Sequence, residues 1–320
     1  MKKTLLVVLA SLLMPLSVAA QAKVKIGVSI PTADHGWTGG INFWAKKAIS
    51  DWQAKDKNVE FFLVTADSPQ KQVNDVEDLM AKGINALVIL AHDSAPLTPV
   101  VKKAYEKGIY VVSVDRGLTE PAQNVYIAGD NPGLGAVSAE WLGKAMGGKG
   151  QIVVLEGIPC VINSERVDTF KAVMAKKYPG IKILDSQPAY WDTQKGLQVM
   201  ENYLQKYKQI DAVWAQDDDV LIGVLQAIKE SGRKDIKIAL GGAGSKIMVK
   251  KVMDGDPLVQ ADVTYPPSMI ATGISLAVDG AQNRGLGGFY QKKIPSKIIL
   301  ASEPITKENA KDYYVPDSVY

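Results

Sequence analysis

The sequence contains little cysteine and histidine. Cys160 is the only cysteine, and His35 and His92 are the only histidines among 320 residues. A single cysteine cannot form a disulfide within the chain, so we expect a thiol shielded in the core and a fold held together by packing alone. These three residues are also too few for a zinc cluster or a Cys-His catalytic dyad, and we expect neither a metal nor a cofactor.

Long apolar runs are scarce as well. The chain begins with Lys2 and Lys3, an apolar stretch to about Val18, and small residues at Ala20 and Ala22. This pattern predicts a cleavable signal peptide over residues 1–22, and no cysteine follows it to carry a lipid anchor. No later segment reaches the ~18 apolar residues of a membrane span, so we expect a soluble protein exported to the periplasm.

The excess of charge is small. Lys and Arg number 37 against 34 Asp and Glu, a net charge of +3, and loss of Lys2 and Lys3 with the signal peptide leaves 3 − 2 = +1. Such a chain has no electrostatic basis for binding nucleic acid or an acidic membrane. The remaining residues, at 47% hydrophobic composition over the whole chain, suffice for two domains of roughly 150 residues each.

Strands alternate with helices along the whole mature chain. Short runs rich in β-branched residues begin at Val24, Val59, Ile84, Ile109 and Asn124, and a second series begins at Gln151, Ile181, Ile210, Ile236 and Leu258. Between them, apolar residues recur at helical spacing over 97–105 and 220–228, and each pattern stops at a glycine, Gly108 or Gly232. The sequence therefore predicts the α/β class, with two doubly wound parallel-sheet lobes.

Two elements remain after these series. The stretch 266–280 has a helical pattern, and a last strand begins at Ser296. An odd strand after two complete series predicts that the chain crosses between the lobes more than once.

Two full charges follow directly on a strand. The run YVVSVDRG from Tyr110 ends in Asp115 and Arg116. Charged groups tolerate burial only when they are paired with polar groups, and ligands bind at the carboxyl ends of strands in open parallel sheets. We therefore expect this pair at a binding site.

Several segments together resemble one family. They are VSVDRG, NVYIAGDNPGLG, NSERVDTF, SQPAYWDTQKGL and AVWAQDDDVLIGVLQAI, in this order. The chain resembles the type I periplasmic sugar-binding proteins of ABC importers, near their ribose- and allose-binding branch. The resemblance implies two lobes joined by three hinge strands, with residues 23–129 plus 265–293 in the first and 130–264 plus 294–320 in the second. It also implies one monosaccharide or polyol between the lobes and a membrane permease as partner.

The resemblance also implies which residues bind the ligand. Charged side chains form the stronger hydrogen bonds to sugar hydroxyls, and aromatic rings cover the C–H faces. The ligand-binding positions implied in this way are Ser29, Trp37, Asp115, Arg116, Arg166, Trp191 and Asp217. Asp34 and His35 lie in the same loop as Trp37, which is longer here than in the ribose branch, and we expect them to be ligand-binding residues as well.

Two positions depart from the ribose branch. Its Phe-Asp pair is replaced by Gly242 and Ala243 in GGAGSK, and its later glutamine aligns with Thr264. Each unmatched hydrogen-bonding group costs roughly 1–3 kcal/mol, so ribose itself would bind weakly. We expect a larger or differently hydroxylated sugar, or a polyol, with extra bulk placed near Gly242 and Ala243.

Each of these residues also has a structural interpretation. Asp115 and Arg116 can form a salt bridge at a strand end, Arg166 can brace its helix, and Trp191 can pack against the helix that follows. Asp217 can equally be the N-cap of a helix. The sequence alone leaves these interpretations open.

Other functions find less support. Gly241 to Lys246 lacks the spacing of a phosphate-binding loop, and apolar residues follow Asp217 to Asp219 where a calcium loop needs oxygen ligands. A signal peptide stands where a lac-repressor relative carries its DNA-binding headpiece. We expect a monomeric binding protein and no enzyme. A sensory protein that docks on a chemoreceptor or sensor kinase, and a sugar-modifying enzyme, remain as alternatives.

Overall fold

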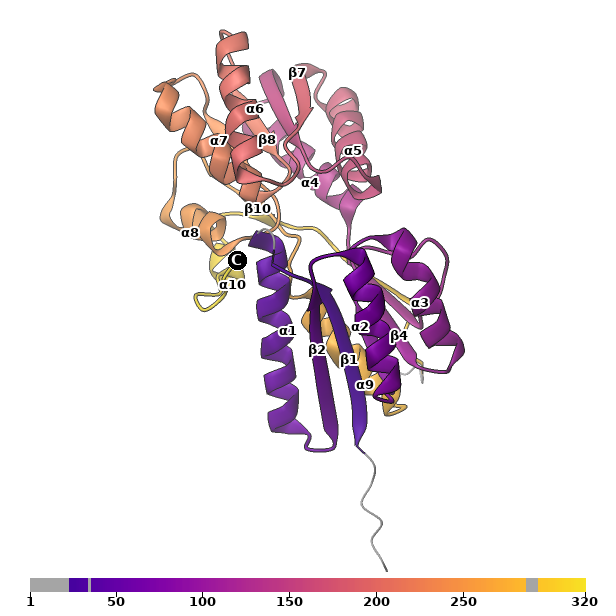
Figure 1. The fold of residues 1–320 in the computed structure, drawn as a ribbon. Coiled ribbons are helices and arrows are strands. Elements are labelled where there is room, and N and C mark those ends of the chain that lie inside the picture. The colour runs from indigo at the N-terminus through magenta and orange to yellow at the C-terminus, as the bar shows by residue number, and fades with distance from the viewer. Residues whose placement is uncertain (1–22, 34–35, 286–292) are drawn as a thin grey trace, which may run out of the picture.

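Two lobes lie one above the other, with the chain crossing between them (Figure 1). The computed structural model describes residues 23–33, 36–285 and 293–320. The first lobe contains β1 (Val24–Pro31), α1 (Gly36–Lys55), β2 (Val59–Ala66), α2 (Pro69–Ala81), β3 (Ala86–Ile89), α3 (Ser94–Glu106), β4 (Tyr110–Val114), β5 (Val125–Gly129), α9 (Met269–Ala281) and β11 (Lys297–Leu300). The second contains α4 (Asn131–Ala145), β6 (Lys149–Glu156), α5 (Val161–Lys177), β7 (Gly180–Pro188), α6 (Thr193–Lys206), β8 (Ala212–Ala215), α7 (Asp218–Ser231), β9 (Ile238–Leu240) and α8 (Lys246–Asp254).

Each lobe is built on one parallel sheet. The strand order is β11-β5-β4-β3-β1-β2 in the first lobe and β7-β6-β8-β9 in the second. Apolar strands such as Ala86–Ile89 and Ala212–Ala215 are fully buried, as expected when helices cover both faces of a sheet. The predicted α/β class with two parallel-sheet lobes is confirmed.

Local signals set the helix boundaries. The Asp130 carboxylate accepts a hydrogen bond from the Gly133 amide at 2.8 Å and begins α4. The helices predicted over 97–105 and 220–228 form as parts of α3 and α7, and Gly232 closes α7 in the left-handed conformation. The stretch after Pro266 forms α9.

Three segments cross between the lobes and lie side by side. They are the link from β5 to α4, the short strand β10 (Asp262–Val263) with the residues after it, and the residues after β11. The Asp130 amide donates to the Leu300 carbonyl at 2.9 Å, and the Thr264 amide donates to the Glu303 carbonyl at 2.9 Å. The expectation of more than one crossing is therefore confirmed.

Three details differ from the sequence expectations. The strand Lys297–Leu300, assigned to the second lobe, pairs with β5 and completes the first sheet. The run from Leu258 does not add a fifth strand to the second sheet, because only Asp262 and Val263 form a strand, antiparallel to β12 (Pro304–Ile305). Cys160 is exposed at the start of α5, not shielded in the core.

No helix in 23–33, 36–285 or 293–320 is long and apolar enough to cross a bilayer. The expected signal peptide lies outside the described residues.

A pair of buried carboxyl groups joins β10 to α7. Asp218 accepts from the amides of Gly242 at 3.0 Å and Ser245 at 2.7 Å, and Asp262 accepts from Gly244 at 3.1 Å. The two side chains are fully buried and hydrogen-bond to each other. Burial raises the pKa of both, and the charge of Asp218 raises the pKa of Asp262 further. Asp262 therefore carries the shared proton that it donates to Asp218.

Close packing of α4 on α5 fixes the position of Arg166. A Cβ added at Gly135 would lie 2.1 Å from the Arg166 carbonyl oxygen. The missing side chain lets the two helices approach each other.

We predict that Gly135→Ala lowers the free energy of unfolding by about 1–3 kcal/mol, because the added methyl group pushes α5 away. Denaturant unfolding measures the change. Gly39→Ala is the matched control, since a Cβ there would meet only Val319, at an ordinary 3.9 Å. The free energy of unfolding of Gly39→Ala should equal that of the wild type or exceed it by roughly 0.5–1 kcal/mol. Equal stability of both variants would contradict the packing argument.

The carboxyl pair predicts a loss of stability as pH rises. The folded state holds a proton that an unfolded Asp releases near pH 3.8. Between that pH and the higher pKa of the folded state, the folded protein binds more protons than the unfolded chain. Raising the pH through this range therefore lowers the free energy of unfolding, by up to about 1.4 kcal/mol per pH unit. In Asp262→Asn an amide replaces the shared proton as donor, and urea unfolding between about pH 4 and pH 8 should lose this component of the slope. Asp254→Asn is the surface control, and a slope unchanged in Asp262→Asn would refute the shared proton.

Candidate functional site

A cleft opens where the carboxyl ends of both sheets face each other. Its empty space, including the opening to solvent, is about 400 Å³. Both lobes and the middle crossing segment contribute to its wall, which is formed by Trp37, Asp115, Arg116, Ile162, Arg166, Trp191, Asp217, Ala243 and Tyr265. Seven of these nine were expected from the sequence.

Asp115 enters the cleft in a strained backbone conformation. Its φ of 58° lies in the left-handed region, which non-glycine residues rarely adopt. The Tyr126 hydroxyl donates to the Asp115 carbonyl at 2.7 Å and secures the turn. The next residue, Arg116, donates from Nη1 to the His92 carbonyl at 2.8 Å. The strand end thus brings Asp115 and Arg116 into the wall of the cleft.

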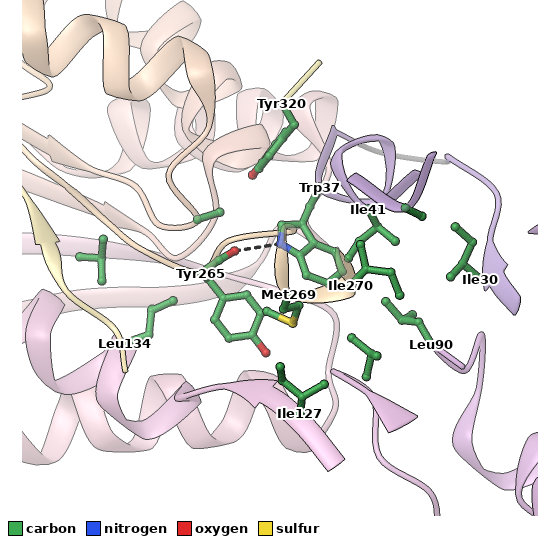
Figure 2. Packing of buried hydrophobic residues seen from close by; sticks show 14 of the residues in the cluster. Ile30, Trp37, Ile41, Leu90, Ile127, Leu134, Tyr265, Met269, Ile270 and Tyr320 are labelled. Carbon is green, nitrogen blue, oxygen red and sulfur yellow. Dashed lines mark hydrogen bonds between the residues drawn. The ribbon is translucent and has the colours of Figure 1, made fainter. Parts of the chain in front are cut away.

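Tyr265 contacts the charged groups of both lobes. Its hydroxyl donates to Asp115 Oδ1 at 2.6 Å, and the Arg166 guanidinium lies 4.3 Å from its ring centroid. Burial and the charge of Asp115 raise the pKa of Tyr265 well above its usual value, so the hydroxyl remains a donor. The Trp37 indole donates to the Tyr265 carbonyl at 3.0 Å (Figure 2).

Arg166 reaches the cleft from α5. It is 5% exposed, and its Nε donates to Asn131 Oδ1 at 2.8 Å. A longer contact of 3.5 Å joins Nη1 to the Gln216 carbonyl. A guanidinium has five N–H groups. Arg166 therefore keeps donors for a ligand.

Trp191 forms the wall beside Arg166. Tyr190 and Trp191 both have positive φ, 57° and 56°, which is a strained arrangement typical of functional loops. The Trp191 ring centroid lies 5.8 Å from the Arg166 guanidinium. Its buried Nε1 has no hydrogen-bond partner among the described residues. A Cβ at Gly157 would lie 2.1 Å from this nitrogen, so glycine is required there.

Asp217 serves as a helix cap at the cleft wall. Its carboxylate accepts from the Asp219 amide at 2.9 Å and the Val220 amide at 3.4 Å, and it begins α7. It is 5% exposed and lines the cleft. The structural and the ligand-facing interpretations of this residue are compatible.

Ala243 occupies a strained turn above the Asp218–Asp262 pair. Its φ is 139°, and its amide donates to the Val263 carbonyl at 2.7 Å. Gly242 is not among the described residues that line the cleft, and a Cβ there would lie 3.1 Å from the Gln216 carbonyl oxygen. Little space is therefore open beside Gly242 for the extra ligand bulk expected there.

Two expected positions lie away from the cleft. Ser29 is fully buried and accepts from Gln72 Nε2 at 3.2 Å. The Thr264 hydroxyl accepts from the Glu303 amide at 2.9 Å, within the crossing segments. Neither is among the described residues that line the cleft. Asp34 and His35 lie outside the described residues.

The sequence analysis missed Tyr265, Ile162 and Asn131. Tyr265 directly follows Thr264, so a shift of one residue would have found it, and the Pro266-Pro267 pair behind it marks a fixed segment. Ile162 is the second residue of α5 and directly precedes NSERVDTF. Asn131 carries no local signal, because its role depends on Arg166, 35 residues later.

The comparisons with known proteins agree with this architecture. Residues 26–284 match the family model described as periplasmic binding protein domain. The ribose import binding protein RbsB of Bacillus subtilis (strain 168) is 31% identical over 280 residues, 87% of each chain. The galactofuranose-binding protein YtfQ of Escherichia coli (strain K12) is 31% identical over 333 residues, 99% of this chain and 96% of that one.

Solved structures include the fructose-binding periplasmic domain of a hybrid two-component system. It has a TM-score of 0.75 at 28% identity and covers 91% of this chain and 93% of its own. The resemblance stated from the sequence is thus confirmed, as is the expectation of a binding protein and not an enzyme. The chain belongs to the periplasmic binding protein family.

Proposed function

We propose that this protein captures a monosaccharide or polyol between its lobes in the periplasm and delivers it to an ABC-type importer. The observation that carries the proposal is the placement of Asp115 and Arg166, from different lobes, on either side of Tyr265. The relatives named for ribose and galactofuranose support the class of ligand.

The chemistry of the wall suits a neutral polyhydroxyl ligand. Two carboxylates, Asp115 and Asp217, face two guanidinium groups, Arg116 and Arg166, so the formal charges of the described lining cancel. Each sugar hydroxyl both donates and accepts, and can satisfy both kinds of group. The rings of Trp37 and Trp191 offer apolar surface for C–H faces.

The ligand differs from ribose in this proposal. Ala243 brings no carboxylate, and Tyr265 fills space in the middle of the cleft. Without that carboxylate, the remaining N–H donors of Arg166 make the wall richer in donors relative to acceptors. These features favour a differently hydroxylated sugar or a polyol.

The lobes act as two bodies joined at the three crossing segments. We assign residues 23–129 and 265–300 to the first lobe, 130–264 and 301–320 to the second, and residues 1–22 to a cleaved signal peptide. Ligand can stabilise the closed form only through contacts to both lobes. The closed monomer is then recognised by the permease.

A sensory role is the second candidate. It is supported by the fructose-binding domain of a hybrid two-component system at 28% identity. Here the closed protein docks on a chemoreceptor or sensor-kinase ectodomain. Deletion of a partner permease would abolish uptake and spare signalling only in this case.

Mass spectrometry of small molecules released from freshly purified protein tests the function. A thermal-shift panel of D-ribose, D-allose, L-arabinose, D-fructose, xylitol and myo-inositol accompanies it. Because ligand bound only by the folded state raises the melting temperature, we expect one unmodified sugar or polyol and a matching shift. An empty site and no shift across the panel would contradict the proposal.

Arg166→Ala should weaken binding of that ligand about tenfold or more, because charged hydrogen bonds of this kind contribute roughly 1.5–3 kcal/mol. Titration calorimetry measures the affinity, and circular dichroism checks the fold. Lys176→Ala removes an exposed cation from the same helix and serves as the control. Unchanged affinity in Arg166→Ala would remove this arginine from the site.

A further inference from the structure

Tyr320 lies between the two lobes and is not among the described residues that line the cleft. It is 8% exposed and belongs to the apolar cluster that also contains Trp37 and Tyr265 (Figure 2). A Cβ at Gly36 would lie 2.7 Å from its ring, and a Cβ at Gly40 would lie 3.1 Å from its Cβ. Both glycines are in the first turns of α1, and their missing side chains let Tyr320 pack closely against the first lobe.

The segment that carries Tyr320 is fixed to the second lobe. Lys246, the first residue of α8, donates to the Pro316 carbonyl at 3.3 Å and also to the Ser318 carbonyl. The Ser318 hydroxyl donates to the Tyr320 carbonyl at 2.6 Å and accepts from its amide at 3.2 Å. The ring is therefore held by one lobe and packed against the other.

The acids beside the cleft surround the Tyr320 hydroxyl. Burial and the charges of Asp217, Asp218 and Asp219 raise the pKa of this hydroxyl well above the usual value. The hydroxyl is buried and has no hydrogen-bond partner among the described residues. Ala243 lines the cleft and also a second cavity, and Tyr320 lines that second cavity. The two cavities thus share Ala243 as a wall residue.

We propose that Tyr320 is a positioning residue that pins the lobes in the closed arrangement and so sets the affinity for ligand. An apolar ring buried between two bodies stabilises the form in which both bodies contact it. Opening the cleft would separate the ring from Gly36 and Gly40 and expose it to water. The effect on affinity rests on the proposed function, whereas the effect on lobe separation does not.

The test compares Tyr320→Ala and Tyr320→Phe with Val319→Ala, a control at the neighbouring side chain, which is 65% exposed. Calorimetry uses the panel sugar or polyol that shifts the wild type most, and small-angle X-ray scattering measures the radius of gyration without ligand. We expect Tyr320→Ala to bind about tenfold more weakly and to have a larger radius of gyration. Tyr320→Phe keeps the ring and should stay within about threefold of the wild type.

Lys246→Met provides a second route if Tyr320→Ala fails to fold. This substitution releases the segment without altering the core. Like Tyr320→Ala, it should weaken ligand binding and increase the radius of gyration of the ligand-free protein. Wild-type affinity together with an unchanged radius of gyration in either variant would overturn the inference. If the wild type binds nothing in the panel, the proposed function fails, and scattering alone decides whether Tyr320 pins the lobes.

Discussion

Two opposite charges from different lobes approach one tyrosine on a crossing segment. Burying a lone carboxylate or guanidinium is costly, and the cost falls only when polar partners replace water. Tyr265 gives Asp115 a hydroxyl donor at 2.6 Å and gives Arg166 an aromatic face at 4.3 Å. The rest of the cleft is arranged around this contact, since Trp37 holds the Tyr265 carbonyl and Asn131 orients the guanidinium.

The same region joins the lobes mechanically. One apolar cluster continues from the first sheet through Ile127, Leu134 and Tyr265 to the second (Figure 2). Beside it, the Asp218–Asp262 pair ties the turn at Ala243 to β10 through backbone amides. Tyr265 and Ala243 therefore line the cleft from the region that joins the lobes, so the proposed function requires ligand binding and lobe closure to be coupled.

The parts that depend on local pattern were predictable. Strand runs, helix periodicity and glycine stops identified the α/β class, and charges at a strand end identified Asp115 and Arg116. Long-range pairing was not predictable in the same way. Nothing in Lys297–Leu300 distinguishes the edge of one sheet from that of the other, and Asn131 acquires its role only from a helix 35 residues away. Ser29 has a hydroxyl at a strand end, but that hydroxyl accepts a hydrogen bond from Gln72 inside the first lobe. Of the neighbouring residues Thr264 and Tyr265, it is Tyr265 that lines the cleft.

A crystal structure of the protein with its co-purified ligand tests the central claim most directly. We expect one small molecule whose hydroxyls lie within about 3.2 Å of both the Asp115 carboxylate and the Arg166 guanidinium, with the lobes closed over it. A ligand that contacts only one lobe, or that lies outside the cleft around Tyr265, would contradict the account.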